Sequence, residues 1–254
     1  MTVMANPHER HLEFLTSRPI AHRGLHDDKQ GRLENTKSAF TAAIKHGYAI
    51  ECDLQLSGDR EAVVFHDETL DRLTLSTGKV SELTADELKS IPLRGTDDRI
   101  LGLDELLSVV NGRVPLVIEL KSLWDGNTGL VERTLEKMRH YTGPYCIMSF
   151  DPDVVGELRR RSPSTIRGIV ADCGFDPYYD SLPALRRRDL RTLAHLEWTA
   201  PDFLSVNWED LPWAPVAALR ASGRPVITWT IRSRDEARQA MKHSDQITFE
   251  GFVP

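Results

Sequence analysis

Short apolar runs alternate with helix-like segments along most of the chain. Each run spans four to six residues and is rich in Val, Ile, Leu and Phe, as buried strands are. This pattern predicts eight strands, at Pro19–His22, Ala49–Leu54, Leu116–Leu120, Tyr145–Phe150, Ile166–Val170, Phe203–Val206, Val226–Thr230 and Gln246–Phe249.

The segments between these strands repeat their apolar residues at helical spacing, as in Ala39, Phe40, Ala43 and Ile44. The predicted helices are Thr36–His46, Thr128–His140, Asp151–Arg161, Pro183–Leu196, Trp213–Ala221 and Ser233–Lys242. Strands that alternate with helices form parallel sheets, and eight such units in 254 residues predict an α/β fold, the (β/α)8 TIM barrel. An open doubly wound sheet is the alternative. The barrel is favoured because polar residues end several strands, and barrel strands bring those ends to one mouth.

One connection is much longer than the others, because about 60 residues separate the second predicted strand from Leu116. It contains a short strand at Ala62–Phe65 and two helix-like pieces at Thr84–Ser90 and Leu103–Val109. Thr84 and Glu87 have the spacing of a capping box. We therefore predict a small inserted subdomain after the second strand, at about 67–110, within a single domain that comprises 1–254.

The second predicted strand carries acidic residues on one of its faces. Ile50, Cys52 and Leu54 alternate with Glu51 and Asp53, so the two carboxylates share a face. In a barrel that face points to the interior, where a hydrophobic residue is the norm. Two carboxylates on the interior face therefore indicate a functional site.

Polar residues also end the neighbouring strands. The first strand ends in His22 and Arg23, and the third carries Glu119, with Lys121 two residues later on the same face. Three carboxylates that converge in a pocket of low dielectric constant repel one another unless a cation lies between them. A divalent cation with oxygen ligands, Mg²⁺ or Ca²⁺, resolves this repulsion. Arg and Lys beside such a cation indicate a phosphate ester as the ligand.

Each of these features alone has a structural explanation. The Glu-x-Asp pair is typical of a solvent-facing edge strand, His66 and Asp67 of a turn, and Glu119 with Lys121 of a surface ion pair. Their occurrence at successive strand ends favours a functional site.

Composition narrows the function classes further. The formal net charge is −6, so the sequence offers no basic surface of the kind that nucleic acid requires. Three cysteines without metal-ligand spacing argue against a zinc site or a disulfide framework. The first residues are polar, and no apolar run approaches membrane-spanning length. We expect a cytoplasmic protein without stable membrane insertion. The sequence is compatible with a homo-oligomer and does not decide the oligomeric state.

Several ordered motifs resemble the glycerophosphodiester phosphodiesterase family. They are HRG at 22–24, ENT at 34–36, AFTAAIKHGY at 39–48, IECDLQLSGD at 50–59, VVFHDETLDRLT at 63–74, IEL-K at 118–121, SFDP at 149–152 and ITWTIR at 227–232. The resemblance is densest over about 20–122. It implies a (β/α)8 barrel with a subdomain after the second strand, and metal-dependent hydrolysis of glycerophosphodiesters to glycerol-3-phosphate and an alcohol.

The resemblance also implies roles for individual residues. The cation would be held by Glu51, Asp53 and Glu119, and the two catalytic histidines would be His22 and His66. The phosphate and substrate would be bound by Arg23, Lys121, Glu34 and Trp229.

The chain departs from the family pattern in three places. Leu33 replaces the proline before Glu34, in a segment lengthened by residues that include His26 and Asp27, which we expect to be loop. The turn after the second strand reads SGDRE and lacks the glycine that ends the family's S-x-DG turn. The family's T-D-x-P near the C-terminus is absent, since the chain ends ITFEGFVP.

Two alternative functions follow from the same barrel. A lysophospholipase D-type phosphodiesterase would need an apolar rim, whereas Leu70, Leu73 and Leu75 alternate with polar residues, as in a segment with one face packed on the barrel and one in water. A non-catalytic phosphodiester-binding barrel would have lost a histidine or a metal carboxylate. Neither loss is seen. We also expect Trp208, with Trp229, to line the glycerol site.

Overall fold

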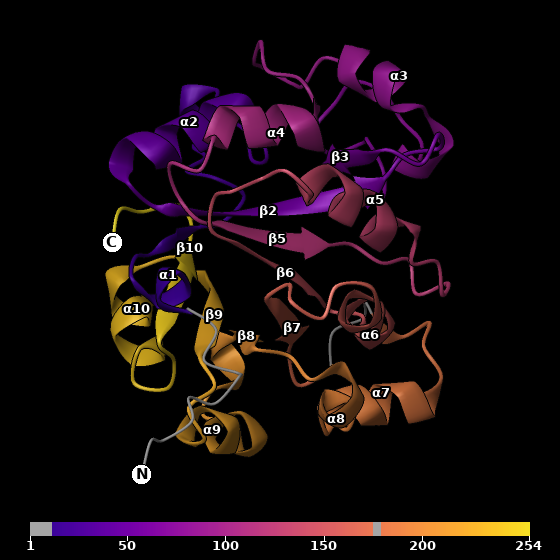
Figure 1. The fold of residues 1–254 in the computed structure, drawn as a ribbon. Helices are drawn as coiled ribbons and strands as arrows, with labels where there is room; N and C mark the ends of the chain where they lie inside the picture. The colour runs from indigo at the N-terminus through magenta and orange to yellow at the C-terminus, as the bar shows by residue number, and fades with distance from the viewer. Residues whose placement is uncertain (1–11, 175–178) are drawn as a thin grey trace.

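A closed barrel of eight parallel strands forms the centre of the computed structural model, which describes residues 12–174 and 179–254 (Figure 1). Neighbouring strands pair in the order β1, β10, β9, β8, β7, β6, β5, β2, and β1 pairs with β2 to close the ring. The barrel strands are β1 (Ile20–Ala21), β2 (Ala49–Leu56), β5 (Leu116–Leu120), β6 (Tyr145–Ser149), β7 (Arg167–Ala171), β8 (Phe203–Asn207), β9 (Val226–Ile231) and β10 (Gln246–Phe249). The predicted (β/α)8 TIM barrel is confirmed, and the open sheet is excluded.

Helices surround the strands on the outside (Figure 1). The longer ones are α2 (Lys37–His46), α4 (Leu103–Val110), α5 (Gly129–Met138), α6 (Pro152–Arg161), α7 (Ala184–Arg191), α9 (Ala214–Ala221) and α10 (Arg234–Ala240). Short helices lie at α1 (Glu13–Thr16) and α8 (Leu196–Thr199). The continuous helix predicted at Pro183–Leu196 is wrong. Leu193 has a φ of 53°, a left-handed conformation that a right-handed helix cannot include, and it separates α7 from α8. None of the described helices is both long and apolar enough to span a bilayer.

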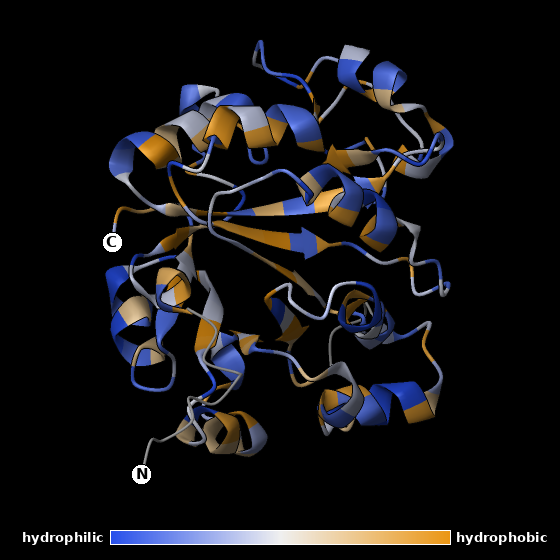
Figure 2. Cartoon of the chain, in the orientation of Figure 1, coloured by the Kyte–Doolittle hydropathy of each residue, from blue (hydrophilic) through white to orange (hydrophobic). Residues whose placement is uncertain are grey.

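Strand β2 divides its side chains between two environments. Ile50, Cys52 and Leu54 belong to the same buried cluster as Phe40 and Ala43 of α2, and burial stabilises the fold by about 1.5–3 kcal/mol for each large apolar side chain. The intervening carboxylates therefore face the barrel interior, as the alternation predicts. Figure 2 shows hydrophobic residues along much of the barrel strands, and hydrophobic and hydrophilic residues mixed along the surrounding helices.

The long connection after β2 folds back along the sheet. Strand β3 (Ala62–Val64) pairs antiparallel with β2, and β4 (Leu101–Gly102) pairs with β3. Helix α3 (Ala85–Ser90) starts at the predicted capping box of Thr84 and Glu87. Helix α4, near the end of the connection, packs against α2 in the outer layer.

The insertion has a hydrophobic cluster of its own, which we call the insertion core. Its buried residues are Leu33, Val63, Phe65, Leu70, Leu73, Val80, Ala85, Leu88, Leu93 and Ile100. The segment was expected to pack one face on the barrel, but Leu70 and Leu73 pack inside the insertion instead. Leu75 is 78% exposed. This core fixes the backbone of 65–73, which borders the barrel mouth.

Candidate active site

A cavity of about 520 Å³ opens at the carboxyl ends of the strands. Nine of the residues predicted from the sequence line it: His22, Arg23, Glu34, Glu51, Asp53, His66, Glu119, Lys121 and Trp229. Side chains from β1, β2, β5, β9 and the insertion thus meet in one place, because parallel barrel strands all end at the same face.

The tight turn after β1 aims the first two of these side chains. The His22 backbone N–H donates to the Phe249 carbonyl at 2.9 Å, which ties the turn to β10. Gly24 has a φ of 82°, and a Cβ there would lie 2.9 Å from the Ala39 Cβ, so no larger residue fits. The close contact with α2 holds Arg23 over the carboxylates.

Three buried carboxylates lie together at the base of the cavity. Glu51, Asp53 and Glu119 are between 1% and 7% exposed, and each offers a ligand atom within 4.8 Å of the others. Burial and the neighbouring charges of Asp53 and Glu119 raise the pKa of Glu51 well above its ordinary value. The group has the oxygen ligands that Mg²⁺ and Ca²⁺ prefer, and a divalent cation would relieve the repulsion that raises this pKa. The residues present therefore fit such a cation.

Cationic side chains lie against the same carboxylates. Lys121 Nζ is 2.7 Å from Glu119 Oε1 and 3.2 Å from Asp53 Oδ1, and Arg23 Nε is 3.5 Å from Asp53 Oδ2. Burial alone would raise the pKa of Asp53, but nearby positive charges, led by Lys121, hold it below its ordinary value. These cationic groups could bind an anion if a metal ion neutralised the carboxylates.

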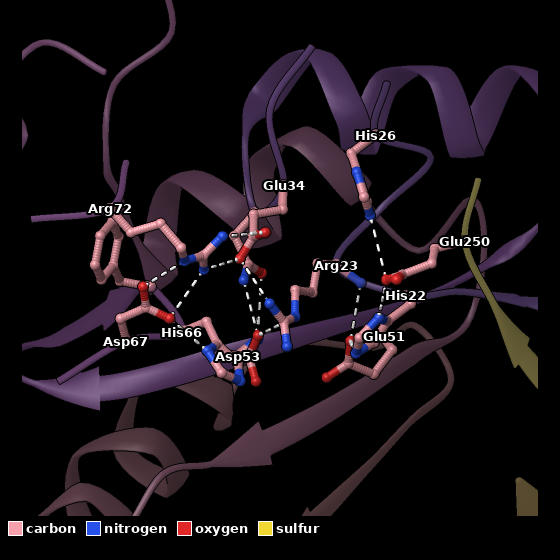
Figure 3. A network of polar contacts seen from close by, with 12 residues as sticks. His22, Arg23, His26, Glu34, Glu51, Asp53, His66, Asp67, Arg72 and Glu250 are labelled. Atoms are coloured by element: carbon pink, nitrogen blue, oxygen red, sulfur yellow. Dashed lines mark hydrogen bonds and ion pairs between the residues drawn. The ribbon is translucent and has the colours of Figure 1, made fainter. Parts of the chain in front are cut away.

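Each predicted catalytic histidine is held by a carboxylate at Nδ1 (Figure 3). His22 Nδ1 lies 2.6 Å from Glu250 Oε2, and His66 Nδ1 lies 2.7 Å from Asp67 Oδ1. Such a bond places the proton of a neutral imidazole on Nδ1 and leaves Nε2 as the acceptor. Burial lowers the pKa of His22 to about 4, although the Glu250 hydrogen bond opposes it. His22 is therefore neutral at pH 7 and can accept a proton.

Several residues of the site were not among those predicted, and three of them hold predicted residues in place. Glu250 follows β10 directly and also accepts from Arg232 Nε at 2.9 Å. Asn35 donates from Nδ2 to Asp53 Oδ2 at 2.8 Å. Arg72, in the insertion, donates to both Glu34 and Asp67. The acidic residue after the last strand in ITFEGFVP was the available signal for Glu250, whereas the other two contacts depend on tertiary structure.

Other expectations concern residues at the rim. Trp229 lines the cavity and stacks edge-on with Phe150 at 5.5 Å between ring centroids. Trp208 is not among the lining residues and packs instead against the hydrophobic cluster that contains Phe40 and Phe249, so its predicted place was wrong. Asp27 caps a loop turn, as expected, but His26 lines the cavity with Nε2 3.5 Å from Glu250.

Comparison with known proteins identifies the family. The sequence profile of the glycerophosphoryl diester phosphodiesterase family matches residues 22–248. The chain belongs to this family of enzymes. A glycerophosphodiester phosphodiesterase of Caldanaerobacter subterraneus subsp. tengcongensis is 32% identical over 174 residues, which are 64% of this chain and 70% of the relative.

Solved structures of family members share the fold. A phosphodiesterase of Oleispira antarctica, solved in complex with the product sn-glycerol-3-phosphate, superimposes with a TM-score of 0.76 at 23% identity, over 93% of this chain and 94% of that one. A glycerophosphodiester phosphodiesterase of Thermotoga maritima gives a TM-score of 0.69 at 26% identity, over 91% and 92% of the two chains. The predicted family resemblance is confirmed.

Proposed function

We propose that this enzyme hydrolyses water-soluble glycerophosphodiesters to glycerol-3-phosphate and an alcohol, with a divalent cation. The observation that carries the proposal is the grouping of three buried carboxylates with two carboxylate-held histidines in one cavity. The Caldanaerobacter relative bears the name of this activity, and the Oleispira structure contains its product. A single domain over 1–254, a cytoplasmic location and a possible homo-oligomer remain predictions.

Glu51, Asp53 and Glu119 would hold the cation, Mg²⁺ or Ca²⁺. When bound, it would neutralise negative charge on the phosphate as the transition state forms. Arg23 and Lys121 would bind the phosphate oxygens, and Arg23 is suited to this by its planar fork of donors. Glu34 accepts from Arg23 Nη1 at 2.7 Å and keeps the guanidinium in place. The carboxylates are thus separated from the substrate's charge by cationic groups.

The two histidines would move the protons. His22, neutral through burial, would take the proton from the attacking hydroxyl, either water or the glycerol 2-hydroxyl that gives a cyclic phosphate for water to open. As the bond from phosphorus to the alcohol oxygen breaks, His66 would protonate that oxygen, for which it must enter the step as an imidazolium that carries a second proton on Nε2. Glu250 and Asp67 hold both rings by Nδ1, so each Nε2 stays available to the substrate.

Glu250 should matter through the orientation of His22. We expect Glu250→Gln to lower kcat on the order of 10- to 100-fold, within the usual contribution of acid–base groups, because an amide cannot balance the charge of the imidazolium that forms. Steady-state kinetics with glycerophosphocholine measure this. The control is Glu157→Gln, whose carboxylate accepts from Arg160 and Arg161 on α6, away from the cavity. An unchanged kcat in Glu250→Gln would remove Glu250 from the mechanism.

The size and polarity of the cavity predict the substrate class. Its apolar wall comprises Met148, Phe150, Val170 and Trp229, whereas the rest of the lining is mostly charged or hydroxylated. A lipid tail needs a contiguous apolar surface, but Leu75, the exposed leucine of 67–76, stands among polar neighbours. We therefore expect deacylated diesters to be preferred over lysophospholipids.

Comparing kcat/KM for glycerophosphocholine and for lysophosphatidylcholine below its micellar concentration tests this preference. We expect glycerophosphocholine to have the higher value by at least tenfold. A tenfold preference for the lysolipid, about 1.4 kcal/mol in the transition state, would instead support the lysophospholipase D alternative.

A further inference from the structure

Arg72 extends from the insertion toward the barrel mouth (Figure 3). Its neighbours Leu70 and Leu73 are buried in the insertion core, and the Thr74 backbone N–H donates to the Leu70 carbonyl at 3.0 Å. The backbone that carries Arg72 is therefore fixed by packing, although its side chain is 46% exposed.

The guanidinium of Arg72 bridges two carboxylates. Nε and Nη2 donate to Asp67 at 2.6 and 2.9 Å, while Nη1 and Nη2 donate to Glu34 at 2.8 and 2.6 Å. Two bidentate contacts fix a guanidinium in both distance and plane, which a lysine ammonium cannot reproduce. Burial alone would raise the pKa of Glu34, but the hydrogen bonds from Arg72 and the charge of Arg23 lower it to about 2.

Each of these carboxylates has a second partner at the reaction centre. Asp67 Oδ1 is the atom that holds His66 Nδ1, and Glu34 Oε1 is the atom that holds Arg23 Nη1. Arg72 thus stands between the group proposed as general acid and the group proposed to bind phosphate. Its hydrogen bonds go to the two carboxylates and not to His66 or Arg23.

The geometry points to Arg72 as a positioning residue, which sets His66 and Arg23 in their working places through Asp67 and Glu34. This inference deepens the proposed function and rests on it. It also gives the insertion a part in catalysis, because the core around Leu70 and Leu73 fixes the backbone from which Arg72 extends.

We expect Arg72→Ala to act by two separable routes. Through Asp67 it should misplace His66 and lower kcat on the order of 10- to 100-fold, the cost that a misplacement of about 1 Å can carry. Through Glu34 it should loosen Arg23 and raise KM. Arg72→Lys should behave like Arg72→Ala, since charge without the fork cannot bridge two carboxylates.

A double-mutant cycle with His66→Ala separates positioning from general destabilisation. In the His66→Ala background, adding Arg72→Ala should change kcat by less than about twofold, since the route through His66 is already lost, while the rise in KM persists. The matched control is Arg133→Ala, because Arg133 also bridges two carboxylates, Glu61 and Glu136, but away from the cavity. It should leave kcat and KM unchanged.

Three results would overturn the inference. One is an equal loss of kcat from Arg72→Ala in both backgrounds, another is a wild-type kcat in Arg72→Ala, and the third is full recovery in Arg72→Lys. If Arg72→Ala does not fold, Arg72→Lys takes its place in the cycle and the first two criteria apply to it. Asp53→Ala separates a failure of the proposed function from a failure of the role inferred for Arg72. Activity in Asp53→Ala would refute the proposed function itself. If Asp53→Ala is inactive, the results above test the role of Arg72 alone.

Discussion

Replacing any one of Glu51, Asp53 and Glu119 by alanine should abolish turnover, and chelation should do so reversibly. The three carboxylates are buried, and their ligand atoms lie within 4.8 Å of one another. The loss of one would remove a ligand and a negative charge, and the remaining two would bind the cation more weakly. Turnover of glycerophosphocholine before EDTA, after EDTA and after addition of Mg²⁺ or Ca²⁺ measures the dependence.

The same carboxylates should link metal binding to stability. A ligand that binds only the folded protein stabilises it, and a cation bound here would also relieve the repulsion that raises the pKa of Glu51. The unfolding temperature should therefore rise with metal concentration in the wild type and not in Asp53→Ala. The control is Glu157→Ala, which loses a surface ion pair with Arg160 and should keep both activity and the metal-dependent rise. Full turnover by metal-free protein would refute the metal site.

His22→Ala and His66→Ala should each lower turnover of an unactivated diester by about 10²–10⁴-fold. Both rings line the cavity and have Nδ1 held by a carboxylate, which leaves Nε2 for proton transfer. His46→Ala is the control, since His46 is exposed at the end of α2 and should not affect the rate.

The leaving group tells the two histidines apart. A p-nitrophenyl diester needs no proton on its departing oxygen, so the loss should shrink for the general acid alone. We expect this rescue in His66→Ala, because His22 is buried and neutral and so suited to the base role. Rescue in His22→Ala instead would exchange the roles, and rescue in neither variant would remove general acid catalysis from both.

Periodicity predicted the fold because each strand of a (β/α)8 barrel is a local apolar run. It also predicted the carboxylates: Glu51 and Asp53 could be assigned to the interior because Ile50, Cys52 and Leu54 occupy the opposite face of β2. The side chains of β1 and β5 followed from the same rule. These parts of the site are encoded within single strands.

Contacts between distant segments could not be read from the sequence in this way. Glu250 reaches His22 across 228 positions, and Arg72 reaches Glu34 across 38. The prediction for Trp208 was wrong because its ring packs against the hydrophobic cluster that contains Phe40 and Phe249. The prediction for Leu70 and Leu73 was wrong because the insertion has its own core. In each case the partner is decided by packing between elements, which local spacing does not specify.

The products formed from glycerophosphocholine test the central claim most directly. Phosphorus NMR of a reaction with purified protein and Mg²⁺ identifies which bond has broken, since glycerol-3-phosphate and phosphocholine give separate signals. We expect glycerol-3-phosphate to accumulate, to stop forming in EDTA, and to be absent with Asp53→Ala. Phosphocholine as the product, no turnover with either Mg²⁺ or Ca²⁺, or an undiminished rate in EDTA would contradict the proposed reaction.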